Sequence, residues 1–355
     1  MAHQHDTSQA DAGLPPIDLR SDTVTKPTGA MYARMASAPL GDDGLDGDPT
    51  VQELEAVAAA ALGKDAGLFV PSCTMANLLA TLAQSQRSEQ IVLESNAHMY
   101  TSERGAATFT GQFYLAIAGT AGAMDLNLLE YALQGEGLKL GTALVAMETS
   151  HNNASGAVLP LDHMQAVHAM ASARGVPVHL DGARLFNAAV ALEKAPAEVA
   201  RHCDTVSLCL SKGLSAPAGA VLAGPRAVID SSRRFRRMLG GTQRQIGVLA
   251  AAGLEAVQVM GTRLGEDHRR ARVLSDALNG MPKLSATIPQ TNIVQVDVSL
   301  SGRDSAVWSG ALEREGLRAR PWGKHRLRCV THRHIGDAEI DRAVMAFRAV
   351  AEVLL

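Results

Sequence analysis

The chain has 355 residues, of which 46% are apolar and 19% charged, and its formal net charge at pH 7 is -3. This composition is typical of a globular protein and excludes a largely disordered one, and the length is sufficient for two domains. The small negative charge and the 3% content of aromatic residues argue against nucleic acid or an anionic membrane as a partner.

The first 16 residues lack the apolar segment and basic start of a secretion signal, so we expect a disordered tail over 1–16. No apolar run reaches the roughly 18 residues that a membrane span requires. The four cysteines are scattered and have no CxxC spacing. We therefore expect reduced thiols and a cytoplasmic protein.

From about residue 50 to 225, short β-rich runs alternate with helical patterns. Strands are predicted over 67–72, 90–95, 113–119, 143–150, 176–183, 205–211 and 219–224. Helices are predicted over 51–63, 74–84, 160–175 and 183–194. This alternation predicts an α/β fold whose sheet is mostly parallel and covered by helices on both faces.

The rest of the chain predicts a helix over 226–239 and one long helix from about 244 to 279. After it we expect a compact α+β unit, with strands over 292–298, 317–322 and 326–331 and helices over 305–316 and 338–355. The expected division is a large α/β domain over 17–250 and a smaller C-terminal domain over 251–355.

Two titratable residues each end an apolar strand, Asp181 in "VPVHLDGA" and Lys212 in "SLCLSKG". Ligands of open α/β sheets bind beyond the carboxyl ends of strands, and burial lowers the pKa of a lysine toward its neutral form. The pair suits a pyridoxal phosphate site, where a lysine forms a Schiff base and an acid pairs with the pyridine nitrogen. From these two residues alone, a buried ion pair or two exposed strand-end residues is equally possible.

Two further features follow predicted strands that are consecutive in the sequence. In "FVPSCTMANLL", the hydroxyls of Ser72 and Thr74 and the free N–H groups of a helix start could hold a phosphate, although any capped helix looks similar. His98, after the next strand, could stack on the pyridine ring or be an ordinary loop histidine.

The segments "IDLRSDTVTKPT", "PSCTMAN", "ETSHN", "HLDGARLFNA", "CLSKGLSAPAGAVLAG" and "RCVTH" occur in this order. From about Ile17 to the C-terminus the chain thereby resembles the low-specificity L-threonine aldolases of the β-eliminating lyase group. The resemblance implies the fold type I pyridoxal phosphate architecture and cleavage of an L-β-hydroxy-α-amino acid (threonine, allo-threonine or a bulkier analogue) to glycine and an aldehyde. It also implies a homotetramer whose active sites are shared across a dimer interface.

The same resemblance implies roles for single residues. Lys212 would carry the Schiff base, and Asp181 would pair with the pyridine nitrogen. Arg184 would neighbour the ring oxygen, and His98 would stack on the ring and is the candidate base. The implied phosphate contacts are Ser72, Cys73 and Thr74, with Arg237 and Arg244 reaching across a subunit interface. The implied substrate contacts are Ser21, Arg184 and Arg328, of which Ser21 and Arg328 would grip the carboxylate. The planar fork of an arginine suits a carboxylate. No residue of the chain is expected to bind a metal ion.

The chain also departs from the family pattern. It has no histidine between Met124 and Glu148, where many members have one shortly before "ETSHN", and "QGEGLKLGTALV" looks shortened. Leu45 replaces a usual tyrosine, Thr242 and Gln243 replace glycine and methionine, and Cys73 replaces glycine. These changes indicate a rebuilt pocket around the β-carbon. An aldolase for a β-aryl or β-carboxy substrate, or a β-eliminating lyase with the same cofactor, therefore remains an alternative.

Two clusters invite a metal-binding interpretation. The acidic loop 41–50 could bind a hard cation, but aspartate and glycine are also ordinary turn residues. His325, His332 and His334 have basic neighbours instead of carboxylates, and we interpret them as a solvated rim.

Overall fold

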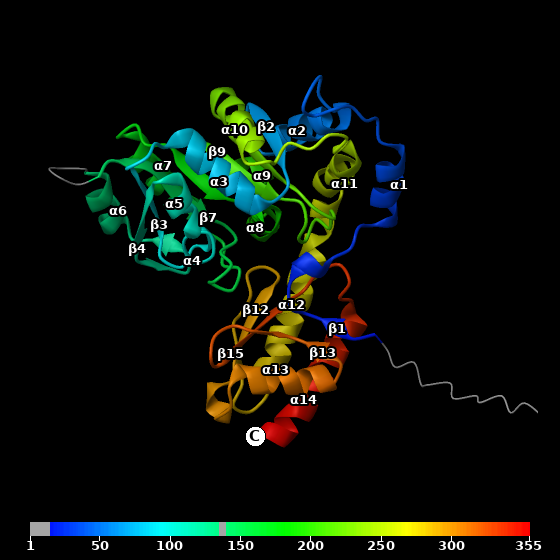
Figure 1. Ribbon diagram of the computed structural model, residues 1–355. Coiled ribbons are helices and arrows are strands. Elements are labelled where there is room, and N and C mark those ends of the chain that lie inside the picture. Colours follow the sequence, from blue (N-terminus) through cyan, green and yellow to red (C-terminus); the bar gives the residue numbers. More distant parts are fainter. Residues whose placement is uncertain (1–14, 135–139) are drawn as a thin grey trace, which may run out of the picture.

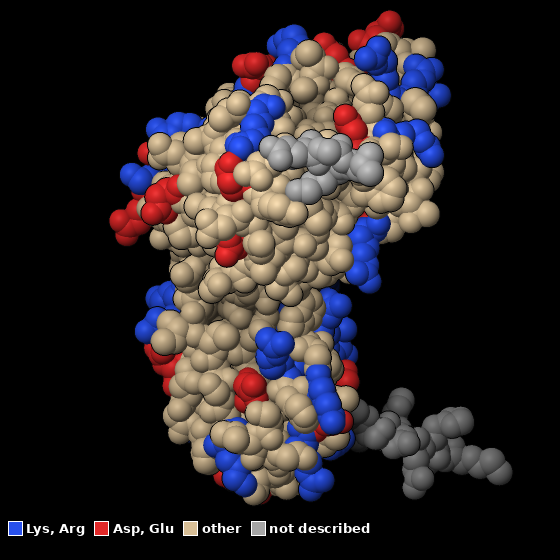
Figure 2. Space-filling model, turned by 90° about the vertical axis from the view of Figure 1, so that its left-hand side faces the viewer, with Lys and Arg blue, Asp and Glu red and all other residues tan. Residues whose placement is uncertain are grey.

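The computed structural model describes residues 15–134 and 140–355. They form a large unit around a seven-stranded sheet and, below it in Figure 1, a smaller unit that contains the C-terminus. Figure 2 shows acidic and basic side chains interspersed over one face of both units, in line with the small net charge. In the described part of the chain, no helix is both long and apolar enough to cross a membrane.

The central sheet has the strand order β2-β10-β9-β8-β7-β3-β4. These strands are β2 (Ala66–Val70), β10 (Ala220–Gly224), β9 (Thr205–Cys209), β8 (Val178–Asp181), β7 (Thr142–Glu148), β3 (Gln90–Glu94) and β4 (Phe113–Ile117). β10 runs in the opposite direction to the other six strands of this sheet, which all run the same way. All residues of β8, β9 and β10 are buried, because helices cover both faces, and this burial explains their near-continuous apolar sequences.

The helices of the large unit begin where the sequence supplies caps. The Asp48 carboxylate accepts hydrogen bonds from the first turn of α2 (Pro49–Ala61), and the Ser72 hydroxyl caps α3 (Cys73–Gln84) through the Met75 N–H. The other helices of this unit are α1 (Gly29–Ser37), α4 (His98–Thr101), α5 (Gly105–Thr110), α6 (Leu126–Leu133), α7 (Leu161–Ser172), α8 (Leu185–Leu192), α9 (Pro196–Ala200), α10 (Arg226–Met238) and α11 (Gly247–Gln258).

The smaller unit packs helices against a four-stranded antiparallel sheet with the order β11-β12-β15-β14. Its elements are β11 (Ser285–Ala286), β12 (Ile293–Asp297), β14 (Arg320–Pro321), β15 (Arg326–Val330), α13 (Ser305–Arg314) and α14 (Asp337–Leu354). The N-terminal strand β1 (Ile17–Asp18) joins this unit by pairing in parallel with β13 (Leu317–Arg318). Ile17 therefore packs in the second hydrophobic core, although we expected residue 17 to begin the large domain. The boundary between residues 250 and 251 stays a prediction.

Two predicted elements are wrong in extent. The long helix expected over 244–279 is three pieces: α11, a 3-10 turn (Met260–Arg263) and α12 (Leu264–Asn279). At the break Gly261 lies against the Phe186 ring, where an added Cβ would be 2.5 Å from the ring. The strand expected over 317–322 is split into β13 and β14, which belong to different sheets.

The two clusters considered for metal binding have structural partners. In the acidic loop, Asp48 caps α2, Asp43 pairs with buried Arg236 at 2.7 Å, and Asp42 accepts a hydrogen bond from the Gly44 N–H. His332 is buried and its Nε2 bonds the Asp18 carbonyl at 2.8 Å, so the interpretation of a solvated rim is wrong for this residue. The prediction for 1–14 lies outside the described residues, and so do residues 135–139 of the segment 134–145 that looks shortened.

Candidate active site

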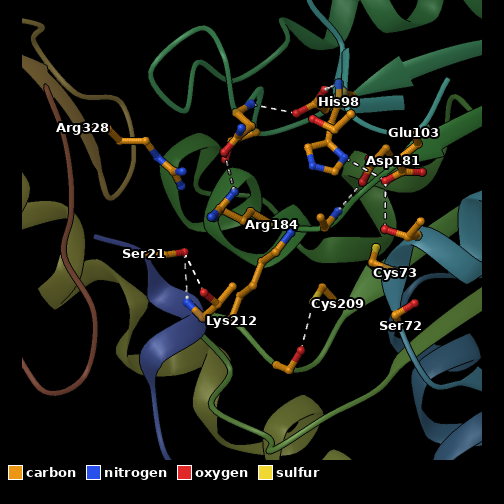
Figure 3. Close-up of a pocket in the computed structure, with 18 of the residues that line it drawn as sticks. Ser21, Ser72, Cys73, His98, Glu103, Asp181, Arg184, Cys209, Lys212 and Arg328 are labelled. Carbon is orange, nitrogen blue, oxygen red and sulfur yellow. Dashed lines mark hydrogen bonds and ion pairs between the residues drawn. The ribbon is translucent and has the colours of Figure 1, made fainter. Parts of the chain in front are cut away.

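A cavity of about 340 Å³ lies where β8 and β9 end, and residues of both units line it. Figure 3 shows Ser72 and Cys73 on one side, Ser21 and Arg328 on the opposite side, and Lys212 between them. Nine of the eleven predicted site residues line this cavity: Ser21, Ser72, Cys73, Thr74, His98, Asp181, Arg184, Lys212 and Arg328. Arg237 and Arg244 do not, and both are exposed. Their predicted role, contact with the cofactor phosphate of a neighbouring subunit, stays a prediction.

The Asp181 carboxylate is buried and held in one orientation. Its Oδ2 accepts a hydrogen bond from Asn77 Nδ2 at 3.0 Å, and its Oδ1 accepts one from the Ala183 N–H. The Asn77 amide is in turn fixed because its Oδ1 accepts from Ser207 Oγ and bonds His179 Nε2. Burial lowers the pKa of His179 to about 4, so this imidazole is neutral. The result is a carboxyl group held in a fixed position at the cavity.

Lys212 follows β9, and its carbonyl accepts a hydrogen bond from Thr25 Oγ1 at 2.9 Å. Among the described residues, no hydrogen bond or ion pair of its ammonium group is found. Burial lowers the pKa of Lys212, but the neighbouring Cys209, Cys73 and Asp181 outweigh it, so the net shift is upward. The expectation that the pKa of this lysine is lowered toward the neutral form is therefore wrong. Because the raised pKa favours the protonated form, Lys212 must lose a proton before its amine can attack an electrophile.

Two thiols form part of the cavity wall beside Lys212. Cys73 Sγ donates to Ser207 Oγ at 3.4 Å, and Cys209 Sγ contacts Ser211 Oγ. The hydrogen bond between the two thiols raises the pKa of Cys73 and lowers that of Cys209. The Cys73 side chain thus points toward β9 and away from the free N–H groups at the start of α3, as its replacement of glycine requires.

His98 is held by a carboxylate that the sequence did not single out. Its Nδ1 lies 2.8 Å from Glu103 Oε1, and this hydrogen bond raises the pKa of His98. Glu103 also accepts hydrogen bonds from Thr74 Oγ1 and Asn77 Nδ2. Within the described residues His98, Glu103 and Asp181 are the group whose ligand atoms lie within 4.8 Å of one another. Hydrogen bonds account for this cluster without an ion.

Replacing Glu103 by glutamine is expected to lower the pKa of His98, because the carboxylate that stabilises the imidazolium is removed. An NMR titration of the His98 ring measures this shift. Any pH–rate limb that reports deprotonation of His98 should move to lower pH in the same variant. Glu130→Gln is the matched control, since Glu130 pairs with Arg174 outside the cavity. An unchanged titration in Glu103→Gln would show that the contact is not maintained in solution.

Arg184 forms a buried, bidentate ion pair with Asp22. Arg184 Nε and Nη2 lie 2.7 Å from the two Asp22 oxygens, and Asn292 Nδ2 also donates to Asp22. Burial raises the pKa of Asp22, but the charge of Arg184 outweighs it and holds the pKa well below its usual range. Two donors of Arg184 are thus already engaged. Asp22 was missed, although it directly follows Ser21 in "LRSDTVT".

The opposite wall of the cavity contains unpaired polar atoms. Arg328, on β15, is buried and its Nε has no hydrogen-bond partner among the described residues. Ser150 Oγ, which lines the cavity from the large unit, also has no partner there. Burial, and next the charge of Arg184, lowers the pKa of Arg328 to about 9. A buried, unpaired donor next to another cation is expected to bind an anion.

Known proteins share this architecture. The structure of the chain has a TM-score of 0.80 to the threonine aldolase of Leishmania major (17% identity, covering 95% of this chain and 100% of that one). It has a TM-score of 0.75 to the serine palmitoyltransferase of Sphingomonas wittichii (16% identity, covering 96% and 89%). The fold is therefore that of the fold type I pyridoxal phosphate enzymes, and the predicted fold class is confirmed.

Sequence comparison gives the family. Residues 18–301 match the model of the β-eliminating lyases. The chain is 36% identical to low-specificity L-threonine aldolase 1 of Arabidopsis thaliana, covering 94% of this chain and 95% of that one. It is 40% identical to the low specificity L-threonine aldolase of Escherichia coli K12, covering 74% and 79%. The chain belongs to the β-eliminating lyase family, and the predicted family is confirmed.

Proposed function

We propose that this lyase is a pyridoxal phosphate-dependent aldolase that cleaves an L-β-hydroxy-α-amino acid to glycine and an aldehyde. The relatives named low-specificity L-threonine aldolases support this reaction. The observation that carries the proposal is the convergence of Lys212 and Asp181, from the ends of the adjacent strands β9 and β8, on one cavity. Arg328 reaches the same cavity from the other unit.

The residues present fit the cofactor. The first N–H groups of α3 have no partner within the helix and, with the Ser72 and Thr74 hydroxyls, would hold the phosphate. Asp181 would pair with the pyridine nitrogen, since its carboxylate is buried and fixed. Lys212 would be the covalent anchor, and its ammonium group has no competing partner among the described residues. His98 would stack on the ring, and Arg184 would neighbour the ring oxygen.

When bound, pyridoxal phosphate supplies an electron sink for the bond that breaks. The chain's own residues would do the rest. Arg328 and Ser21 would bind the substrate carboxylate and so orient the Cα–Cβ bond for cleavage. His98, held at Nδ1 by Glu103, leaves Nε2 as the ring atom that can accept the β-hydroxyl proton, directly or through a water molecule.

The test is an absorbance spectrum and a product assay on the purified protein. We expect a cofactor band and glycine release from L-threonine, L-allo-threonine or phenylserine. A band with a keto acid and ammonia as products would instead indicate the alternative, a β-eliminating lyase. The absence of both the band and any glycine, after incubation with pyridoxal phosphate, would refute the proposal.

We also propose a homotetramer with active sites shared across a dimer interface, in which Arg237 and Arg244 reach a neighbouring subunit's cofactor phosphate. Their exposure outside this chain's own cavity supports that role. The four free cysteines favour a reducing compartment, and we propose the cytoplasm. Light scattering on the purified protein gives the subunit number.

A further inference from the structure

The smaller unit contributes a second arginine to the cavity wall, directly across from Arg328. Arg320, on the edge strand β14, pairs with Arg328 on β15 in antiparallel register. Residues in this relation project from the same face with Cβ atoms roughly 4.5–5.5 Å apart, and like charges there are destabilising. Both arginines line the cavity. Two cations at opposed positions of a small sheet therefore require a compensating interaction.

Trp322 supplies part of that compensation. Its ring centroid lies 5.1 Å from the Arg320 guanidinium carbon and 4.8 Å from that of Arg328. The Trp322 backbone N–H donates to the Arg326 carbonyl at 2.7 Å, which closes the β14–β15 hairpin from which the ring projects. Cation–π contacts of this kind hold two guanidinium groups together without neutralising them.

No carboxylate among the described residues forms an ion pair with Arg320 or Arg328. The acids that line the cavity, Glu103, Glu148 and Asp181, belong to the large unit. The cavity is thus divided, with carboxylates on the wall of the large unit and unpaired arginines on the wall of the smaller unit. A ligand with one anionic group would engage Arg328 and leave Arg320 unpaired.

We propose that Arg320 and Trp322 select L-β-hydroxy-α-amino acids whose β-carbon carries a second carboxylate. This inference rests on the proposed aldolase function and names its substrate class. In a four-carbon diacid the two carboxylates are joined through only two carbons, and Arg320 and Arg328 hold their guanidinium groups beside the same Trp322 ring, so we expect Arg328 to bind one carboxylate and Arg320 the other. The planar fork of each arginine suits a carboxylate.

The reaction needs no additional reactant. The Cα–Cβ bond breaks, its electron pair stays with Cα, and Cα takes up a proton. The β-hydroxyl loses its proton as its oxygen forms a double bond to Cβ. The four-carbon substrate thereby divides into glycine and a two-carbon aldehyde acid.

The kinetic test compares L-3-hydroxyaspartate with L-threonine by glycine release. We expect kcat/KM to favour the diacid by at least about tenfold, the size of one charge-assisted hydrogen bond. Arg320→Gln should remove most of this preference, whereas Arg318→Gln should keep it. Arg318 is the matched control because it lies two positions earlier, pairs with Glu313 and does not line the cavity. An absent preference, or an equal loss on both substrates in Arg320→Gln, would overturn the proposal.

A binding measurement on the holoenzyme separates this inference from the aldolase proposal. Calorimetry with succinate and butyrate compares two and one carboxylates on four carbons. We expect succinate to bind at least about tenfold more tightly, and Arg320→Gln but not Arg318→Gln to abolish the difference. Equal affinities in the parent would refute a second anion site. An equal loss of affinity for succinate and for butyrate in Arg320→Gln would also refute it, because Arg320 and Arg328 would then bind the same carboxylate. If neither amino acid yields glycine, the aldolase proposal fails while this result still decides the role of Arg320.

Discussion

Lys212→Ala is expected to abolish both the cofactor absorbance band and glycine release, lowering kcat by about three orders of magnitude or more. The physical reason is that no other amine lies at the end of β9 or β8 to replace it: Lys212 is the only lysine among the residues that line the cavity. Spectra and initial rates of the purified variant, reconstituted with pyridoxal phosphate, measure the effect.

Two further variants show whether the loss reflects covalent attachment. Lys212→Arg keeps the positive charge but cannot attach to the cofactor, so it should also lack the band. Lys194→Ala removes an exposed lysine near Glu198 and should behave as the parent does. A full band and normal glycine release in Lys212→Ala would contradict the assignment of this residue.

Asp22→Asn is expected to reduce the free energy of unfolding by about 3–5 kcal/mol, because it leaves the buried Arg184 guanidinium without its carboxylate. The two side chains are almost wholly inaccessible, so solvent cannot replace the lost partner. Asp18→Asn is the matched control, since Asp18 pairs with the exposed Arg20 and should contribute only about 0–1 kcal/mol. Urea unfolding of the three proteins measures both changes, and equal effects would contradict the burial argument.

The pH dependence of stability tests the same ion pair. The pKa of Asp22 is lower in the folded protein than its ordinary value of 3.8. Its contribution to stability is therefore complete above the ordinary value and is lost as the pH falls through the folded-state value. Below about pH 4, the parent should lose stability more steeply than Asp22→Asn.

Much of the large unit is predictable because its strands are short apolar runs between turn residues, as β8 and β9 illustrate. The errors arise where distant segments decide the structure. The helix break lies at Gly261, which packs closely against Phe186, and residues 317–322 divide because β13 pairs with β1 while β14 pairs with β15. Neither contact leaves a periodic signal in the local sequence.

Some predicted site residues have a local signature, such as Lys212 at a strand end or Ser72 at a helix start, whereas Ser21 and Arg328 were indicated only by the family resemblance. The missed ones act through partners that are remote in sequence. Asp22 is defined by Arg184, and Arg320 by its register against Arg328. Glu103 is only five positions from His98, but its loop position carries no pattern that predicts the contact.

The parallel pairing of β1 with β13 places Ile17 beside Leu317 and thereby sets the order in which a newly made chain can mature. During translation β1 has no partner until β13, 300 positions later in the chain, has left the ribosome. We therefore expect Ser21 to reach its final position together with Arg328 late in folding, since contacts between distant segments form slowly. A nascent chain that stops before β13 would contain Lys212 and Asp181 but no anion-binding wall, so incomplete products would lack a finished site.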